Sequence, residues 1–513
     1  MTALAMAPYF VWGQHRSIPI EPVVIGDTPQ FFVDDYMVDN RWALNFDQGS
    51  SEMVSRVFHE PKRHPKNPLI PQIRVSPPSA GQPGPAWFSV VKDTESGVLK
   101  MWYQLNVSVA GVTRDEHGKG AWGSRTSAIC YAESPDGLNW VRPKLGLIEW
   151  QGTKDNNVVW LGMNGKRAGE HQIITQIPDH ARRGYLYVMV YLEGGIHLVG
   201  SHDGIHWDRS SHQQIHSMAS DFPNNILYDP VQNEFVMYCR AKTRYLVHGQ
   251  KGDILDRGES RRIARMTSKE LWTRWTREPQ NILLTDELDN VGAFTAFYSM
   301  EVQRNADIYW GLLLPFKWNT DIHAELAFSR DGLRFDRLPW RPKLIPLGPE
   351  GSWDSGMVFP ASNWVEMGNE WWLYYSGWDG PHGLKENVQR GKWRNGATGV
   401  VTIRKEGFIS MRGPKNGGVV CTRSLVWPGG DLVINANAAA GELKVRVSDE
   451  RRRVVPGFDY EDGEPFTGDD VAHKVVWRGA SLNSLTGKIV RLEFYLKEAN
   501  IYTFRARSLS DLR

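Results

Sequence analysis

The sequence predicts an all-β fold, a five-bladed β-propeller followed by a C-terminal β-sandwich. A hairpin pattern, Ser-x-Asp-Gly-apolar-x-aromatic, occurs at Ser134–Trp140, Ser201–Trp207 and Ser329–Phe335. Asp-Gly favours a tight turn because Gly accepts positive φ and Asp bonds to its own backbone. Helical periodicity is nearly absent from the chain, so strands and turns account for most of it.

The spacing of these hairpins indicates a repeat of one blade. The copies begin at Ser134, Ser201 and Ser329, and the second interval is close to twice the first. The intervening copy is found at Ser268–Trp275, which lacks the Gly, and a weaker one begins at Arg404. A repeat of this length fits a four-stranded blade with long loops, and five repeats predict five blades.

Each repeat also contains an apolar, aromatic-rich strand that follows a polar turn. These expected second strands are Leu99–Tyr103, Tyr185–Tyr191, Phe235–Cys239, Ile308–Leu313 and Trp371–Tyr375. The register breaks near residues 413–418, and the alternating apolar residues beyond it predict sandwich strands. We therefore expect an irregular segment at 1–30, the propeller at 31–414 and the sandwich at 415–513.

Charge and cysteine content exclude several classes of partner and site. The 60 basic and 58 acidic residues nearly balance, which argues against nucleic acid or a membrane surface as the main partner. The three cysteines are widely separated, so they form neither a zinc ribbon nor a disulfide framework. No apolar run is long enough for a membrane-spanning helix. The sequence leaves the compartment, cytoplasmic or exported, and the oligomeric state open.

The candidate chemistry rests on carboxylates at the starts of the inner strands. Serine hydrolase, nucleotide-binding and zinc protease motifs are missing from the sequence. A propeller brings the starts of its inner strands to one end of a central channel, so acids there converge. The candidate acids are Glu170, Asp221, Glu301 and Asp354. Glycosidic bond cleavage needs one protonated and one ionised carboxyl. We assign Glu301 as acid, Asp221 as base or nucleophile, and Asp354 as an orienting partner.

Other residues near these positions are candidates for substrate binding. His382 and Trp378 lie in a Gly-rich segment after the last expected strand, and Trp353 precedes Asp354. Arg240 follows a blade-three strand and would bind a carboxylated sugar. Asp35 would contribute an acid if the first strand entered the channel. Each of these residues also has a structural alternative, such as blade packing, a loop cap or a salt bridge.

The hairpins, Gly351–Gly356 and the trailing sandwich resemble the five-bladed propeller glycosidases, the group of glycoside hydrolase families 32, 43, 68, 117 and 130. The segments Phe32–Tyr36, His59–Pro65 and Gly348–Gly356 are most similar to bacterial proteins described as family-32-like. The resemblance implies a pocket at the channel mouth with two Asp and a Glu acid. Families 32 and 43 place their first catalytic Asp on blade one, where this chain has no acid.

The resulting prediction is a glycoside hydrolase that acts on an oligosaccharide or polysaccharide. Two alternatives stay open: a carbohydrate-binding propeller without catalysis, which the missing blade-one acid favours, and a polysaccharide lyase or glycosyl transferase on the same fold. His382 and Arg240 are the residues that a lyase would use. No cofactor is implied, and no motif supports a channel Ca²⁺.

Overall fold

The computed structural model describes residues 21–43, 53–70, 81–108, 125–150, 152–165, 168–218, 223–240, 261–289, 295–317, 321–382 and 396–507. The chain forms two compact units. One unit combines Met1–His59 with Glu406–Arg513, and the other is Glu60–Lys405. Within the described residues, regular structure is almost entirely β, with short 3-10 turns such as Asp179–Arg182 and Leu482–Leu485.

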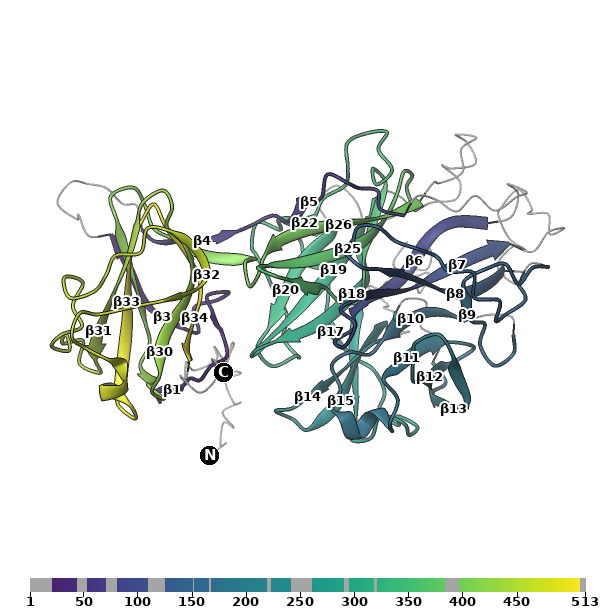
Figure 1. Ribbon diagram of the computed structural model, residues 1–513, viewed down its shortest axis with the longest axis horizontal. Coiled ribbons are helices and arrows are strands. Elements are labelled where there is room, and N and C mark those ends of the chain that lie inside the picture. Colours follow the sequence, from purple (N-terminus) through teal and green to yellow (C-terminus); the bar gives the residue numbers. More distant parts are fainter. Residues whose placement is uncertain are drawn as a thin grey trace, which may run out of the picture. The chain divides into compact units, whose positions relative to one another are not determined.

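The unit Glu60–Lys405 is a five-bladed β-propeller, which confirms the predicted fold class. Figure 1 shows its sheets following one another around a common centre. Among the described residues, each blade is built on four antiparallel strands. In the first three blades these are β6 (Gly81–Lys92), β7 (Leu99–Ser108), β8 (Arg125–Ser134) and β9 (Val158–Trp160); β10 (Gly169–Ile173), β11 (Tyr187–Leu192), β12 (Ile196–Ser201) and β13 (Trp207–His216); β14 (Asn225–Asp229), β15 (Glu234–Arg240), β16 (Ile263–Ser268) and β17 (Gln280–Leu283).

The fourth and fifth blades carry short additional strands. They comprise β18 (Thr295–Asn305), β19 (Ile308–Lys317), β20 (Ala324–Ser329), β21 (Asp336–Arg337) and the added β22 (Lys343–Ile345); then β23 (Met357–Pro360), β24 (Val365–Met367), β25 (Glu370–Trp378), β26 (Gly396–Arg404) and β5 (Lys62–Arg63). The outermost strand of blade five, β5, comes from the start of the unit and pairs with β26. The two ends of the propeller are thus joined within one sheet.

A ring of hydrogen bonds connects each inner strand to the next blade. Side-chain oxygens of inner-strand residues accept from backbone N–H groups of the following blade at 2.7–3.0 Å, in the pairs Ser89 with Ile173, Gln172 with Ile226, Asn225 with Val302, and Gln303 with Trp364. Asn363 Nδ2 closes the ring by donating to the carbonyl of Val90 on blade one. Because buried polar groups need partners, this ring fixes the relative position of the inner strands.

The Asp-Gly hairpins also join neighbouring blades. Ser201 Oγ accepts the Gly204 N–H, and Asp203 accepts the next two N–H groups along the chain. Trp102 Nε1 of blade one then donates to the Gly204 carbonyl at 2.7 Å. Tyr374 and Tyr238 make the same contact with the glycine carbonyls of the other two hairpins. The repeated motif therefore turns the chain and anchors the adjacent blade.

This motif requires glycine for both a conformational and a steric reason. Gly204 has φ +82°, and a Cβ there would lie 2.5 Å from the Trp102 ring. We expect Gly204→Ala to lower the free energy of unfolding by about 2–4 kcal/mol, from the left-handed backbone and the clash together. Gly194 is the matched control, since it has φ +70° with nothing within 4 Å. Urea unfolding of both variants tests this, and equal losses would contradict the steric part.

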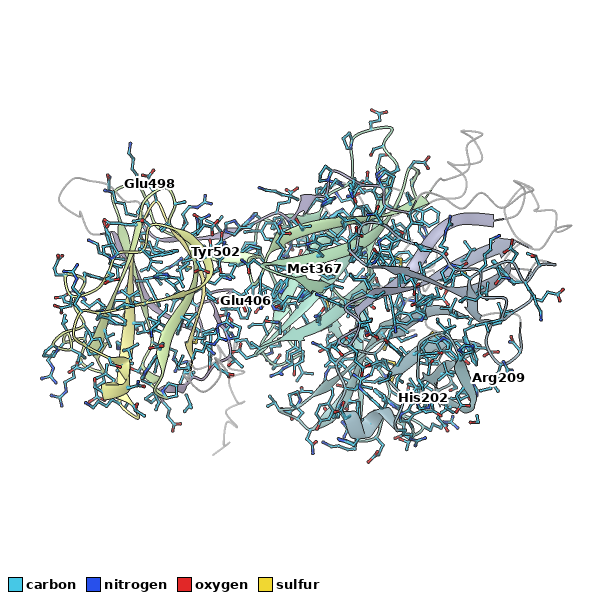
Figure 2. All side chains as sticks on the ribbon, viewed as in Figure 1. His202, Arg209, Met367, Glu406, Glu498 and Tyr502 are labelled. Carbon is cyan, nitrogen blue, oxygen red and sulfur yellow. The ribbon has the colours of Figure 1, made fainter. Side chains whose placement is uncertain are left out.

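The second unit is a β-sandwich of two six-stranded sheets, counted over its described residues. One sheet contains β1 (Val23–Val24), β3 (Val38–Ala43), β28 (Gly418–Thr422), β29 (Leu425–Val426), β31 (Glu442–Asp449) and β33 (Ile489–Lys497); the other contains β2 (Gln30–Phe31), β4 (Ser55–Phe58), β27 (Ile409–Arg412), β30 (Asp431–Asn437), β32 (Asp469–Lys474) and β34 (Asn500–Arg507). Phe32, Phe494 and Phe504 pack together in its core. Figure 2 labels Glu406, which accepts hydrogen bonds from Thr503 and Arg505 within this unit.

The N-terminal strands differ from the expected domain boundaries. The segment from residue 31 was expected to open the propeller, but β2, β3 and β4 pair with β34, β28 and β27 of the sandwich. The sandwich unit resumes at Glu406 rather than at 415. Asp35 accordingly belongs to the sandwich unit, where Arg56 Nη2 donates to it at 2.6 Å. The substrate-binding role of Asp35 stays a prediction.

The described part of the chain contains no helix long and apolar enough to cross a bilayer.

Candidate active site

Glu301 is a buried acid on the inner strand of blade four. It lies in β18, its exposure is 2%, and neither carboxyl oxygen has a hydrogen-bond partner among the described residues. Burial raises the pKa of Glu301 to about 8, because the ionised form loses its hydration. The side chain is therefore neutral at pH 7 and can donate a proton.

Glu170 occupies a strained position on the inner strand of blade two. It has φ +45°, and the register of β10 with β11 shifts between Gly169 and Gln172. Its backbone N–H donates to Gln104 Oε1 of blade one at 2.6 Å. The next residue, His171, is fully buried, and burial lowers its pKa to about 4, so its ring is neutral at pH 7.

Three inner strands carry such irregularities near the end at which they begin, here called the leading end of the propeller. β6 shifts register on both sides of Ala86, β10 shifts at Glu170, and β18 shifts between Phe297 and Met300. Trp87 in β6 has φ +38°, a rare conformation for a bulky residue. Strained residues and bulges cost on the order of 1–3 kcal/mol each and are concentrated at functional sites.

Tyr298 is the centre of an aromatic cluster at the leading end. Its ring centroid lies 5.8 Å from Trp87, 5.5 Å from Phe359 and 5.7 Å from Phe316. His382 Nε2 is 3.2 Å from the Tyr298 hydroxyl. These five residues, the aromatic cluster, come from blades one, four and five, and Tyr298 precedes Glu301 by three residues on β18.

The cluster also contains a cation from blade three. The guanidinium carbon of Arg261 lies 4.4 Å from the Tyr298 ring centroid and 5.5 Å from that of Phe316. His382 was recognisable in the sequence as a candidate, whereas Trp87, Tyr298, Phe359 and Arg261 were not. The available signal was an aromatic residue near the start of three inner strands, which blade packing explains equally well in a chain with 22 tryptophans.

Asp354 is fully engaged in contacts within the propeller. Its Oδ2 accepts from Arg63 Nε at 3.0 Å and from the Tyr375 hydroxyl at 2.9 Å, and Oδ1 accepts from Ser352 Oγ at 2.9 Å. Trp353 stacks on Tyr375 with the ring centroids 5.3 Å apart. Arg63 lies on β5, so these contacts attach the closing strand to blade five and give Asp354 an anchoring position.

We expect Asp354→Asn to lower the free energy of unfolding by about 2 kcal/mol, because the amide removes the charge from the Arg63 contact inside a buried cluster. Tyr375→Phe is the matched control and loses one of the three hydrogen bonds, for about 1 kcal/mol. Chemical denaturation of both variants is the measurement. An unchanged midpoint for Asp354→Asn would contradict the anchoring role.

The other predicted site residues are placed separately. Trp378 ends β25, is buried, and lies against Gly396 of the neighbouring strand. Arg240 ends β15 and pairs with Ile263. Asp221 lies outside the described residues. Glu301 and Asp354 share no hydrogen bond within the described residues, since the partners of Asp354 lie elsewhere.

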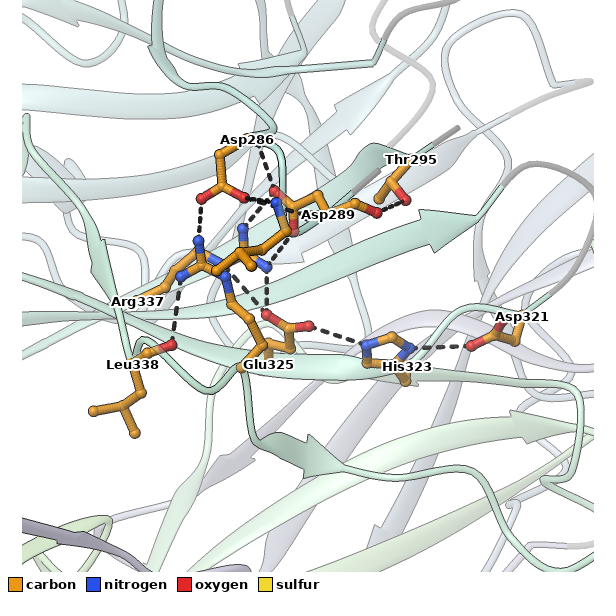
Figure 3. Close-up of polar contacts among 10 residues, drawn as sticks. Asp286, Asp289, Thr295, Asp321, His323, Glu325, Arg337 and Leu338 are labelled. Atoms are coloured by element: carbon orange, nitrogen blue, oxygen red, sulfur yellow. Dashed lines mark hydrogen bonds and ion pairs between the residues drawn. The ribbon is translucent and has the colours of Figure 1, made fainter. Parts of the chain in front are cut away.

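Blade four also contains a buried charge network around Arg337, which Figure 3 shows. Arg337 donates to both oxygens of Asp289 at 2.7 and 2.8 Å and to Glu325 at 2.5 Å. His323 lies between Glu325 and Asp321, each at 3.1 Å. Burial opposes the charged form of His323, but its two carboxylate partners outweigh that effect and raise its pKa. Ile322, next to His323, bridges to Phe316 of the aromatic cluster.

The described residues contain no group of three or more His, Cys, Asp or Glu side chains arranged to hold a metal ion. They do form a five-bladed propeller that has strained inner strands and an aromatic cluster at its leading end and a buried neutral acid, Glu301, further along β18.

Comparisons with known proteins return solved structures only. No family model matches the chain, and neither does any curated protein sequence. A β-1,2-mannobiose phosphorylase from Listeria innocua is 11% identical over 67% of this chain and 97% of its own, with a TM-score of 0.46. A structure from the family-130 mannoside phosphorylases is 15% identical over 68% of this chain and 95% of its own, with a TM-score of 0.44. A thermostable family-43 glycoside hydrolase is 13% identical over 65% of this chain and 93% of its own, with a TM-score of 0.40. At these values the likenesses carry no argument about the reaction.

Proposed function

We propose that this protein is a carbohydrate-active enzyme, a glycoside hydrolase that works at the leading end of the propeller with Glu301 as its proton donor. The observation that supports this most is the neutral carboxyl of Glu301, which has no partner among the described residues and lies three residues from the aromatic cluster on the same strand. A buried carboxyl without a partner costs stability. A strand with no functional demand would carry an apolar residue there.

The reaction requires two carboxyl groups with different protonation. Glu301 gives its proton to the glycosidic oxygen as the bond to the anomeric carbon breaks. A second carboxylate, Glu170 or Asp221, takes a proton from the attacking water or attacks the carbon itself. The aromatic cluster supplies apolar side chains beside a few polar groups, a composition typical of small-ligand sites. Glu301 recovers its proton from solvent in a one-step reaction, or from the single water that enters in the second step of a two-step reaction, so the cycle is balanced.

A sugar-binding propeller without turnover is the second candidate. It is favoured by Asp354, because all three donors around that carboxylate are supplied by the protein. Without Asp354, the candidate catalytic acids are Glu301, Glu170 and Asp221. Binding alone would use the aromatic cluster and would leave the protonation of Glu301 without a role.

The deciding experiment is a screen of the full chain against aryl glycosides and plant, algal and fructan oligosaccharides, read by reducing ends and mass spectrometry. Glu301→Gln, Glu170→Gln and Asp221→Asn are compared with wild type. Turnover that Glu301→Gln loses supports the proposal. Turnover that Glu301→Gln retains would overturn the assignment of the acid. Sugar binding without turnover on any substrate would favour the second candidate.

A further inference from the structure

Arg261 is a cation in the aromatic cluster for which the described residues supply no carboxylate partner. Its Nη1 atom is buried and has no hydrogen-bond partner within that part of the chain. Its guanidinium lies over the Tyr298 and Phe316 rings. Contact with ring faces attracts a cation but satisfies none of its N–H donors.

Several partly or fully buried arginines of this chain have carboxylate partners. Arg337 is paired with Asp289 and Glu325, Arg63 with Asp354, and Arg446 with Glu493. Such pairing is the rule for charges removed from water, because an uncompensated buried ion is costly. Arg261 has no such partner among the described residues, like Arg304 over the Tyr309 ring, and it lies at the end of the propeller where inner strands are strained and aromatic rings converge.

The charges described near Arg261 leave this cation unneutralised. Arg262 follows in the chain, is buried, and donates through Nη1 to the Arg261 carbonyl. Arg240 ends the adjacent strand, opposite Ile263. Glu301 does not supply a negative charge, since burial keeps its carboxyl neutral at pH 7 by raising its pKa. Arg240, Arg261 and Arg262 thus place three arginines near the leading end of blade three.

We infer that Arg261 forms an anion subsite, and that the substrate carries an oxyanion, a uronate carboxylate or a sulfate ester, on a sugar residue that Arg261 contacts beside the aromatic cluster. This inference rests on the proposed function for the role of Glu301 in cleavage. A guanidinium presents paired N–H donors that match such oxyanions, whereas a neutral sugar would leave the charge uncompensated. Tyr298 and Glu301 are three residues apart on β18, so the subsite lies on the strand that carries the proton donor.

The test measures binding of oligosaccharides to the full chain by calorimetry, at fixed ionic strength. Oligouronates are compared with their methyl esters, and sulfated oligosaccharides with their desulfated forms, because each pair shares one backbone and differs in charge. We expect one acidic ligand to bind at least about 10-fold more tightly than its neutral form. Arg261→Gln should weaken acidic binding by about 10- to 100-fold, so that the affinities of the acidic ligand and its neutral form become similar.

Arg183 provides the matched control. It also places its guanidinium over a ring, 5.1 Å from the Trp272 centroid, but it lies in the connection between β10 and β11, away from the leading end. Arg183→Gln should keep the preference for the acidic ligand. Arg261→Lys, which keeps the charge but loses the paired donors, should retain part of it.

The outcomes separate this inference from the proposed function. Equal binding of acidic and neutral forms, or an unchanged preference in Arg261→Gln, would overturn the anion subsite, whatever the turnover of the wild type. A preference for acidic ligands that needs Arg261, without turnover on any of them, would keep the subsite and refute the hydrolase. Among the acidic ligands, the pair that shows the preference distinguishes a carboxylate from a sulfate.

Discussion

Glu301→Gln is expected to lower turnover by about 10²- to 10⁴-fold, the usual contribution of a general acid. The same change should raise the free energy of unfolding by about 3 kcal/mol at pH 7, because it removes a group that the fold keeps protonated. Gln has the shape of the neutral acid but cannot donate an acidic proton. Initial rates and urea unfolding of the full chain measure the two effects.

The pH dependence follows from the direction of the Glu301 shift. Its pKa is raised from 4.5 to about 8 in the folded protein. Between these values the folded state binds more protons than the unfolded state, so stability falls as pH rises from about 4.5 to 8. The stability gain of Glu301→Gln should therefore grow over this range and level off above pH 8. Turnover of the wild type should decline as pH rises through 8.

Glu234→Gln is the matched control for a buried carboxylate. Glu234 begins β15 of blade three, at the end opposite the leading end, where it forms ion pairs with Arg265, Lys269 and Arg277. Its replacement should cost stability and leave turnover unchanged. Loss of stability in Glu301→Gln, or a gain that does not depend on pH, would contradict the account of Glu301.

Arg337→Met is expected to lower the free energy of unfolding by about 3–5 kcal/mol, the second large effect. The side chains of Arg337 and Asp289 are each 4% exposed, and that of Glu325 is 8% exposed. Removing the cation leaves two carboxylates buried without their shared partner. Chemical denaturation gives the loss, and Arg341→Met is the control. Arg341 pairs with the half-exposed Asp286, so its loss should stay within about 1 kcal/mol.

The network should also make the free energy of unfolding depend on pH, both at acidic pH through Asp289 and at higher pH through His323. Burial alone would raise the pKa of Asp289, but Arg337 outweighs it and lowers that pKa, so its contribution is lost as pH falls through the folded value. The raised pKa of His323 gives a contribution that is complete below about 6.5 and is lost as pH rises through the folded value. In a plot of unfolding free energy against pH, Arg337→Met should flatten the fall at acidic pH. A parallel shift of the whole curve would argue against this linkage.

The fold was largely predictable because its signals are local. An Asp-Gly turn needs only neighbouring residues, and its copies at Gly137, Gly204 and Gly332 reveal the blade period. The N-terminal strands were misplaced for the opposite reason. Their partners, such as β34 for β2, come from the other end of the chain, and no local pattern encodes that pairing.

The site was less predictable, since its roles depend on contacts between distant residues. Asp354 has the sequence context of an inner-strand acid, yet its carboxylate accepts a hydrogen bond from Arg63, which lies at the start of the propeller unit. Glu301 was recognisable as an acid in an apolar strand. The cluster around Tyr298 was not, because an aromatic residue in a blade has the same sequence signature whether it packs or binds.

The protonation state of Glu301 is the central claim, and infrared difference spectroscopy of wild type against Glu301→Gln tests it most directly. The carbonyl stretch of a protonated carboxylic acid should be present at pH 7 in the wild type, absent in the variant, and lost with a midpoint near pH 8. A band that has already disappeared at pH 7 would show an ionised Glu301 at neutral pH. That result would contradict its role as the proton donor.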